Sequence, residues 1–556
     1  MSFKNFVFFC FTVWFGISCK KENNPEPPVT VVPTSFGFNS LKVDGSYSGF
    51  SYVDVKPKPI IEFNFSAPLN SASFANAVSI ISKTGEVVPY STSLENGDST
   101  VIIIPINALP YLSSYKVLIS KALKSKSNGS LLSEVSINLI TALDTTDKFP
   151  KITDEALLTL VQKQTFRYFW EFGHPTSGLA RERNTSGDIV TSGGSGFGIM
   201  TIPVAIERNF ITRAEGLERM QKIAGFLKDK TQKFHGAFPH WINGATGAVV
   251  PFSTKDNGAD LVETSYLIQG LLTARQYFNN SNPAETALRT DINTIWNGVE
   301  WDWFQKDKGN VLYWHWSPDY NWDMNLPIKG WNECMITYAL AASSPTHPII
   351  KSVYDNGWTG NGSFVNGKSY LGITLPLGEA YGGPLFFSQY SFLGINPTNL
   401  KDGFTNYFTQ NRNHTLINYN YCKSNPKGYY GYSDQCWGLT ASDIPDGYTA
   451  SSPTNDIGVI APTAALSAFP YTPDESMKAL KFFYYKLGDK IWGEYGFYDS
   501  FSLVQPWFAN SYLAIDQGPV IVMIENHRTA LLWDLFMSCP EVKTGMKNLG
   551  FQSPNL

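Results

Sequence analysis

The sequence predicts an all-α (α/α)6 barrel preceded by a small all-β Ig-like sandwich. Three observations predict it. Short apolar runs between turn clusters fill residues 34–143, helical periodicity begins after residue 150, and the helical segments alternate between apolar and amphipathic ones. A chain of 556 residues is also too long for a single small core, so at least two domains are expected.

Residues 1–19 are predicted to be a lipoprotein signal peptide. Lys4 precedes an apolar stretch at 6–17 that is too short to cross a bilayer comfortably, and "GISC" then ends at Cys19. Small residues before a cysteine resemble a bacterial lipoprotein signal, although Gly16 departs from the usual bulky residue. We therefore expect export and lipidation of Cys19, with the polar, Pro-rich segment 20–33 as a linker on either face of a bacterial outer membrane.

Residues 34–143 are predicted to form the sandwich. Runs such as "IIEFNF", "TVIIIPI" and "YKVLIS" have strand composition, and "KPKP", "ENGDS" and "SNGS" mark turns between them. About seven strands in roughly 110 residues are typical of an antiparallel sandwich, and the segment resembles a bacterial Ig-like domain. A spacer role is favoured, with a glycan-binding module as the alternative.

Residues 150–550 are predicted to be the helical domain. It begins after "DTTDKFP" at 144–150, where Thr153 or Asp154 caps a segment with i, i+3, i+4 periodicity. The twelve predicted helices are 154–172, 196–210, 212–230, 260–279, 286–304, 330–343, 346–356, 384–395, 401–420, 456–469, 473–487 and 517–538.

Every second predicted helix is apolar or small on most faces, and each of these follows a loop with Gly or Pro, such as "TSGGSGFG" or "KDNGAD". Helices that are apolar all round belong inside a fold and amphipathic ones outside, so six of each predict an (α/α)6 barrel. No recurring strands support a TIM barrel. An α-solenoid is the alternative, but no fixed repeat period is found.

Composition excludes several function classes. A net charge of −4 and a pI near 6.0 give no basic surface for nucleic acid. "GGSGFG" has neither a preceding strand nor a following Lys-Ser/Thr, so a phosphate loop is not predicted. Only six Cys and seven His occur, without zinc spacing, so we expect no metal and no cofactor. Cys422 and Cys436 are either paired or buried thiols, and a monomer is expected.

Acidic residues collect in the loops that lead into the apolar helices. Inner helices of such a barrel run roughly parallel, so these loops meet at one end, and N-capping is the alternative role for each acid. Asp260 and Asp456 are predicted to be caps. The loops hold Asp188, Asp256, Asp260, Glu263, Lys329, Trp331, Glu333, Glu379, Asp443, Asp446, Asp456 and Asp516.

Aromatic residues are predicted at the same end. Residues 295–331 contain seven Trp, of which Trp316 and Trp322 lie in a loop beside aspartates, and "HGAFPHWING" adds Phe238, His240 and Trp241. Packing explains Trp residues on a helix, but loop Trp beside acids are typical of sugar platforms. Paired carboxylates and flat aromatic faces together favour glycosidic cleavage.

Several long strings resemble one family. They include "GLARERNTSGDIVTSGGSGFGIMTIPVAIERNF", "DNGADLVETSYLIQGLLTARQYF", "LGEAYGGPLFFSQYSFLGINP" and "CWGLTASDIPDGY". Over residues 150–550 the chain resembles the glucoamylase-like lipoproteins of Bacteroidetes, and within them glycoside hydrolase family 144, the β-1,2-glucanases. The resemblance implies an (α/α)6 barrel, hydrolysis of β-1,2-glucan and no metal.

The resemblance implies site residues by position. The acid of "ADLVET" is Glu263, the acid before "GGSGFG" is Asp188, and "WGLTASDxPDGY" supplies Asp443 and Asp446. Glu263 is expected to be the general acid and Asp443 or Asp446 the base, with inversion if the carboxyls stand far apart. Asn184 stands where an acid is expected in relatives. The expected substrate-binding residues are Arg183, Phe238, His240, Trp241, Trp316, Trp331, Glu333, Glu379, Tyr381, Trp437 and Asp516.

The leading hypothesis is a lipid-anchored β-1,2-glucanase, with endo and exo action left open. A hydrolase of another glucan on the same fold is an alternative. A polysaccharide lyase would need Tyr or His bases and Arg or Lys near a uronate, and the few cations of the rim count against it. A non-catalytic glycan-capture lipoprotein would need aromatics without a catalytic pair.

Overall fold

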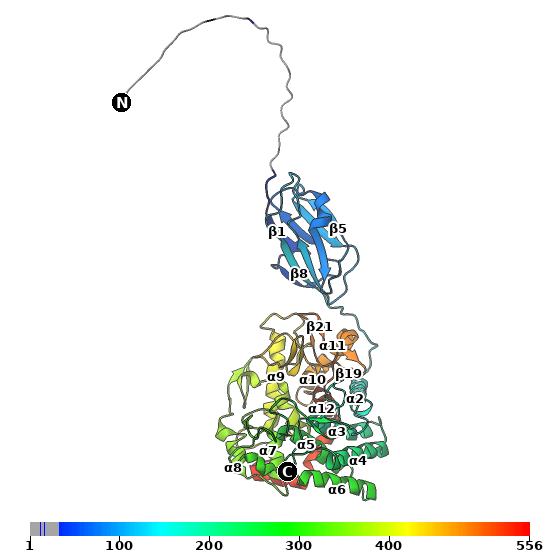
Figure 1. Ribbon diagram of the computed structural model, residues 1–556, viewed down its shortest axis with the longest axis vertical. Helices are drawn as coiled ribbons and strands as arrows, with labels where there is room; N and C mark the ends of the chain where they lie inside the picture. Colours follow the sequence, from blue (N-terminus) through cyan, green and yellow to red (C-terminus); the bar gives the residue numbers. More distant parts are fainter. Residues whose placement is uncertain (1–11, 13–15, 17–32) are drawn as a thin grey trace, which may run out of the picture. The chain divides into compact units, whose positions relative to one another are not determined.

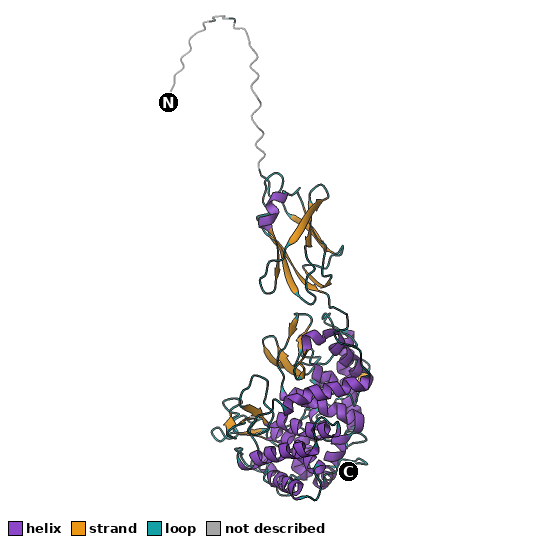
Figure 2. Ribbon diagram, turned by 90° about the vertical axis from the view of Figure 1, so that its right-hand side faces the viewer, coloured by secondary structure: helices purple, strands orange, loops and turns teal. Residues whose placement is uncertain are grey.

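The computed structural model describes Thr12, Gly16 and residues 33–556 (Figure 1). The predicted signal peptide with Cys19, and nearly all of the predicted linker, therefore lie outside the described residues. The described chain forms two compact units, and the second contains residues 139–556 together with two short segments, 52–57 and 109–115. Strands dominate the N-terminal part and helices most of the remainder (Figure 2).

The N-terminal domain contains two four-stranded sheets, so it has eight strands rather than about seven. One sheet has the order β1-β3-β6-β5, with antiparallel neighbours, and the other the order β2-β8-β7-β4. Alternate side chains such as Phe63, Ile103 and Ile137 are fully buried, because successive strand residues face opposite sides. The strands are β1 (Phe38–Val43), β2 (Ser51–Val55), β3 (Ile61–Phe65), β4 (Val78–Ser82), β5 (Tyr90–Glu95), β6 (Thr100–Pro105), β7 (Ser114–Ile119) and β8 (Val135–Thr141), with a short helix α1 (Phe74–Ala77) before β4.

The second unit is helical. Its α-helices are α2 (Asp154–Trp170), α3 (Ser192–Glu207), α4 (Arg213–Asp229), α5 (Leu261–Tyr277), α6 (Pro283–Asn297), α7 (Met335–Ser343), α8 (Lys351–Asn356), α9 (Tyr407–Ser424), α10 (Pro462–Leu466), α11 (Pro473–Ile491), α12 (Ala514–Thr529), α13 (Leu531–Met537) and α14 (Pro540–Leu549). The 3-10 turns η4 (Ala380–Gly382), η5 (Leu385–Ser388) and η6 (Tyr390–Leu393) lie between α8 and α9.

The predicted alternation of apolar and amphipathic helices is visible in burial. Nearly every residue of α3, α5, α7 and α12 is buried, whereas α4 and α6 bury one face only. α4 begins at a capping box in which Thr212 and Glu215 satisfy each other's backbone N–H groups. The buried helices therefore form the interior of the unit, and two of them, α5 and α12, carry an acid in the first turn.

Several predicted helices are shorter than expected. Residues 384–395 form the two 3-10 turns η5 and η6, and only 462–466 of the predicted helix 456–469 is helical. The predicted helix 517–538 divides at Ala530, whose φ of 62° is incompatible with a continuous helix. Apolar composition alone did not distinguish an α-helix from a shorter buried turn. Helix α14 was not predicted.

Glycines at the start of α3 permit close helix packing, which explains the run "GGSGFG" without a phosphate. A Cβ on Gly193 would lie 2.4 Å from Oε2 of Glu263, and one on Gly196 would lie 2.1 Å from the Tyr266 carbonyl oxygen on α5. A Cβ on Gly194 would meet Ala514 at the start of α12. The first turn of α3 thus fits between the first turns of α5 and α12.

Short antiparallel strand pairs also occur in the segments between helices, although no recurring strands were predicted here. They pair β9 (Ile189–Thr191) with β10 (Trp241–Asn243) and β11 (Val249–Val250), β12 (Ala259–Asp260) with β13 (His315–Trp316), β14 (Ser369–Tyr370) with β15 (Ile373–Thr374), β16 (Ala441–Ile444) with β17 (Gly447–Ala450), β18 (Trp492–Gly493) with β19 (Gly496–Phe497), and β20 (Phe501–Ser502) with β21 (Trp507–Phe508). Among the described residues, no helix combines the length and apolarity needed to span a membrane.

Candidate active site

Two groups of mostly buried carboxyls include the acids in the first turns of α5 and α12. The α5 acid cluster consists of Asp256, Asp260, Glu263 and Glu333 with the imidazoles of His240 and His315. The α12 acid cluster consists of Asp443, Asp499 and Asp516 with the guanidinium of Arg183.

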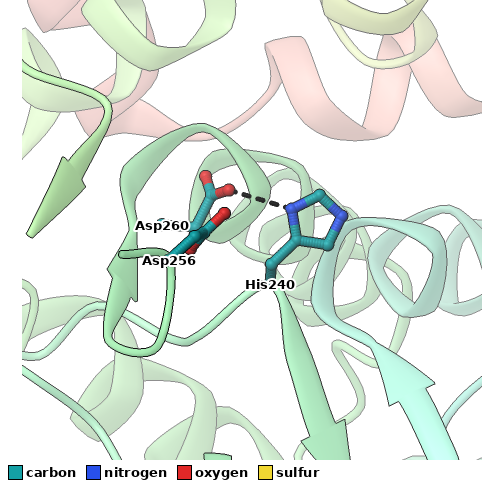
Figure 3. Close-up of side chains that lie close together, drawn as sticks. All are labelled: His240, Asp256 and Asp260. Atoms are coloured by element: carbon teal, nitrogen blue, oxygen red, sulfur yellow. Dashed lines mark hydrogen bonds and ion pairs between the residues drawn. The ribbon is translucent and has the colours of Figure 1, made fainter. Parts of the chain in front are cut away.

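Asp260 is the N-cap of α5, as predicted, and it also binds an imidazole. Its Oδ1 accepts the backbone N–H groups of Val262 and Glu263 at 3.0 and 2.9 Å. Its Oδ2 lies 3.1 Å from Nδ1 of His240, and Figure 3 shows the ring directed at this carboxylate with Asp256 beside it. Burial would raise the pKa of Asp260, but the hydrogen bond from His240 and the charge of His315 outweigh burial and lower it. Asp260 is therefore the ionised anchor of the cluster.

Glu263 lies in the first turn of α5 and is only 8% exposed. Its Oε2 accepts the backbone N–H of Gly193 at 2.8 Å and the hydroxyl of Thr191 at 3.3 Å. The first of these donors is at the N-terminus of α3, where the helix dipole favours negative charge. Burial nevertheless raises the pKa of Glu263, with a contribution from the charge of Asp260, while His240 opposes the rise.

His240 carries positive charge into the cluster. Burial alone would lower its pKa, but the charges of Glu263, Asp260 and Asp256 outweigh burial and raise the pKa to about 9. His315 is held similarly, with Nδ1 at 3.4 Å from Asp256 and 3.7 Å from Asp260, and its pKa is raised as well. Two imidazolium groups thus balance the two aspartates.

Glu333 differs from its neighbours in the cluster. It lies just before α7 and is buried, and no protein group within residues 33–556 donates a hydrogen bond from another residue to its carboxyl. Burial, with the nearby charges of Glu263 and Asp260, raises its pKa to about 7. Glu333 can therefore hold a proton near neutral pH and release it readily.

The donor set of the α5 acid cluster also has metal-ligand chemistry. One atom each of His240, Asp256 and Asp260 lies within 4.8 Å of the others, and carboxylate with imidazole suits divalent cations. The His240 nitrogen that would bind a cation is, however, already directed at Asp260. In this arrangement the imidazolium groups supply the positive charge that a cation would bring.

Asp443 is the charge-paired member of the α12 acid cluster. Both of its carboxylate oxygens lie 3.3 Å from Arg183, and Ser511 donates its hydroxyl to Oδ2 at 2.5 Å. The backbone N–H of Asp443 in turn donates to Oδ2 of Asp499 at 2.6 Å. Arg183 also pairs with Glu182, so one guanidinium joins two carboxylates.

Asp516 and Asp499 form a carboxyl pair. Asp516, in the first turn of α12, is 1% exposed, and neither oxygen of its carboxyl has a hydrogen-bond partner within the described chain. Burial, with the nearby charge of Asp443, raises the pKa of Asp499 to about 7. Burial, with the charges of Asp499 and Asp443, raises the pKa of Asp516 well above its ordinary value.

Two tyrosines, the buried Tyr390 and the half-exposed Tyr448, lie near the acid clusters. The buried hydroxyl of Tyr390, on η6, interacts with the charges of Asp516, Glu333 and Glu263, so it lies between the two clusters. Tyr448 is directly opposite Asp443 in the β16–β17 hairpin, and its ring is 50% exposed. Directly opposite residues share a face of the ladder, so Tyr448 presents a half-exposed ring beside the α12 acid cluster.

Several predicted site residues have surroundings that contradict their expected role. Phe238 and Trp437 are fully buried, and the indole N–H of Trp437 donates to the Glu475 carbonyl, so neither ring can be a sugar platform. Asp456 caps no helix and accepts the hydroxyls of Tyr421 and Tyr432 instead. These residues have packing roles that the motif pattern did not reveal.

Two expected catalytic aspartates lie outside both clusters. The side chain of Asp188 is 63% exposed and hydrogen-bonds His174 at 3.1 Å. Asp446 is exposed in the turn between β16 and β17. Asn184, placed where an acid was expected, bridges the backbone at Asn510 and Tyr512, which is a structural role.

The remaining predicted substrate-binding residues are divided. Trp241 and Trp316 are half-buried in short strands, and Phe252 packs against both His240 and Trp241. Trp331 and Glu379 instead line a separate pocket. Tyr381, in η4, packs against Tyr370 with the two rings tilted. All four cysteines of the described chain are buried and unpaired, so Cys422 and Cys436 form no disulfide.

Sequence reasoning missed Asp499, His315 and Tyr448. Asp499 lies in the loop 492–513, which is rich in aromatics and holds only one other acid, Glu494, and that scarcity was the available signal. His315 was passed over as part of a Trp-rich segment. Tyr448 closes the motif "SDIPDGY", two residues beyond Asp446, and could have been found by placing the motif on a hairpin.

Comparisons with known proteins give two family matches. Residues 325–540 match the family described as "Putative glucoamylase", and residues 41–141 match the bacterial Ig-like domain. A curated relative, the exo β-1,2-glucooligosaccharide sophorohydrolase (non-reducing end) of Parabacteroides distasonis, is 49% identical over 421 residues. That match covers 72% of this chain and 58% of the relative, so the chain spans less than two thirds of its length.

Solved structures are similar over the helical unit. A glucoamylase-like structure from Bacteroides uniformis is 56% identical with a TM-score of 0.72, and the match covers 73% of this chain and all of that one. An endo-β-1,2-glucanase from Chitinophaga pinensis, in complex with sophorotriose and glucose, is 52% identical with a TM-score of 0.71 and the same coverage. Because the similarity extends over the full length of each of these two solved structures, at more than 50% identity, the chain belongs to the glucoamylase-like family that includes them.

Proposed function

We propose that the protein is a glycoside hydrolase that cleaves β-1,2-glucan. The observation that carries the proposal is the pair of buried acid clusters at the starts of α5, α7 and α12, in a chain 52% identical to an endo-β-1,2-glucanase. Glycosidic cleavage needs one carboxylic acid that protonates the leaving oxygen and one carboxylate that activates water or attacks. The two clusters hold carboxyls in both states.

The proposed architecture is an (α/α)6 barrel. The buried elements follow one another around a ring: α3 packs on α5, α5 on α7, α7 on η6, and α12 on η6, α10 and α3. A hydrogen bond from Gln389 to the Ala464 carbonyl joins the 3-10 turns to α10. This closed sequence of inner elements supports the barrel and would place their first turns at one end.

The proposed general acid comes from the α5 acid cluster. Glu263 was the predicted acid, but two donors and His240 favour its ionised form, whereas Glu333 has neither. With a pKa of about 7, Glu333 is partly protonated at neutral pH, as a general acid must be. We therefore assign proton donation to Glu333, and to Glu263 the role of a carboxylate that contacts sugar hydroxyls beside it.

The proposed base comes from the α12 acid cluster. Asp443 is paired with Arg183 and is partly accessible, so it can accept a proton from an attacking water. Asp516 and Asp499 are buried and their pKa values are raised, which suits them to take that proton onward rather than to be the first acceptor. Asp446, the other predicted base, has no such environment.

Purified protein incubated with linear β-1,2-, β-1,3-, β-1,4- and α-1,4-glucans tests the proposal. We expect products from the β-1,2-glucan alone, and their lengths distinguish endo from exo action. Cleavage of another glucan in preference would overturn the linkage assignment. Binding without any product would favour a glycan-capture protein instead.

We also propose that the protein is exported and anchored in a bacterial outer membrane by lipid on Cys19. The support is the segment 1–19, in which an apolar stretch ends in small residues and a cysteine. Metabolic labelling with a fatty acid should mark the wild type and not Cys19→Ser. Equal labelling of both would exclude this anchor.

A further inference from the structure

A pocket of about 680 Å³ has a lining distinct from both acid clusters. It is formed where the segment before α7 meets the segment between α8 and η4, and none of the cluster residues lines it. Its volume is in the range of small-molecule sites in proteins. The proposed acid–base chemistry makes no use of it.

The lining of the pocket matches a polyhydroxyl ligand. Trp331 and Phe364 contribute the buried edges of two aromatic rings. Around them, Asn310, Ser363 and Glu379 are exposed, and within residues 33–556 their side chains form no hydrogen bond or ion pair. Free amide, hydroxyl and carboxylate groups over aromatic carbon are what sugar hydroxyls and C–H faces require.

The charges of the pocket exclude an anion as the preferred ligand. Lys329 and Glu379 both line the pocket and have no ion-pair partner within the described chain, so a ligand would meet one positive and one negative side chain. No arginine contributes to the lining. A neutral ligand with many donors and acceptors satisfies both signs, whereas a phosphate or carboxylate would face Glu379.

The backbone keeps the pocket connected to the active site. Trp331 is two residues before Glu333, and the carbonyl of Glu333 accepts the hydroxyl of Ser391 on η6. Gly378, at φ +97°, passes so close to Trp331 that a Cβ there would lie 2.7 Å from the indole. The ring of Trp331 also packs against Trp358, Phe392 and Tyr407, so its orientation at the pocket is fixed by its neighbours.

We propose that this pocket is a second glucan-binding site, which holds glucosyl units of the substrate chain away from the two acid clusters. The inference rests on the proposed function for the identity of the sugar. Longer chains can reach both sites, whereas the shortest cleaved chain occupies the acid clusters alone.

Two pairs of matched variants test the proposal. Ser363→Trp fills the pocket, and Ser369→Trp adds the same side chain at an exposed position of β14 outside it. Lys329→Met removes the pocket's cation, and Lys368→Met removes an exposed lysine that does not line it. We expect Ser363→Trp to raise KM for long β-1,2-glucan about tenfold, equal to the loss of about 1.4 kcal/mol of binding, with kcat unchanged. KM for the shortest substrate should stay at the wild-type value.

The outcomes separate this inference from the proposed function. Equal KM values for Ser363→Trp and Ser369→Trp on long chains would overturn the second site, as would an equal loss on short and long chains. If the wild type cleaves no β-1,2-glucan, the proposed function is wrong, and calorimetric titration with the same four glucans then decides the pocket. Binding of one glucan that Ser363→Trp abolishes and Ser369→Trp retains would support it, and no binding would overturn it.

Discussion

In the α5 acid cluster, Asp260 and Glu263 each accept two hydrogen bonds from backbone or hydroxyl donors and face an imidazolium. In the α12 acid cluster, by contrast, the carboxyl of Asp516 accepts no hydrogen bond within the described chain and faces the charge of a second carboxyl. Burial raises carboxyl pKa values in both places. The difference is in what opposes burial: helix N-termini and histidines in the first, one arginine directed at Asp443 in the second. The opposing groups lower the pKa of Asp260 and limit the rise at Glu263, whereas burial prevails at Asp499 and Asp516 and raises both pKa values.

The largest effect is expected from the α5 acid cluster. Glu333→Gln should lower kcat by about 10²–10⁴-fold, because an amide cannot donate the proton that the leaving oxygen needs. A glucoside substrate with an aryl leaving group, which departs without being protonated, should restore most of the rate. Glu263→Gln should lose comparable activity without such rescue.

Asp302→Asn is the matched control for both changes, since it removes only a surface carboxylate paired with His347. Rescue of Glu263→Gln and not of Glu333→Gln would return the acid role to Glu263. In either case the comparison of Glu263→Gln with Glu333→Gln identifies which of the two carboxyls donates the proton.

The next effect should come from the α12 acid cluster. Asp443→Asn is expected to lower kcat by about 10²-fold or more on natural and aryl substrates alike, because water activation is needed for both. Asp516→Asn should have a smaller effect on kcat, since Asp443 would remain as first proton acceptor. Stopped assays with both substrates measure this. A larger loss for Asp516→Asn would make Asp516 the base and Asp443 its positioning partner.

Some of this arrangement followed from sequence and some did not. Periodicity located α3, α5 and α12, and the cap at Asp260 followed from residue type at a helix start. The raised pKa values of Glu333, Asp499 and Asp516 could not be predicted, because burial and nearby charges depend on groups that are far apart in the chain. The burial of Trp437 was hidden for the same reason, since only packing distinguishes a core indole from a sugar platform.

A further effect is a decline of stability with rising pH. The pKa values of Glu333 and Asp499 are raised to about 7 in the folded protein, so the folded state binds more protons than the unfolded state between about pH 4.5 and 7. The free energy of unfolding should therefore fall across this window, by roughly 3 kcal/mol for each group. Urea unfolding at pH 5 and pH 8 measures the difference.

Glu333→Gln should reduce this pH dependence, because an amide does not titrate. His240, with a pKa of about 9, contributes stability that is complete below about pH 6.5 and is lost as pH rises through 9, so it adds to the decline in the wild type and in this variant equally. If the free energy of unfolding of Glu333→Gln depends on pH as strongly as that of the wild type, the Glu333 carboxyl is already ionised in the folded wild type near neutral pH.

The smallest effects are expected from the two aspartates outside both clusters. Asp446→Asn and Asp188→Asn should each change kcat less than about threefold, because exposed carboxylates are screened by solvent and are not placed to move a proton in the buried site. Initial rates on long β-1,2-glucan measure both. A loss of 10²-fold or more for Asp446→Asn would mean that the β16–β17 hairpin closes over bound glucan and brings this turn to the α12 acid cluster. In that case Tyr448, on the same hairpin, should also contact the bound glucan, and Tyr448→Ala should show a raised KM on the same substrate.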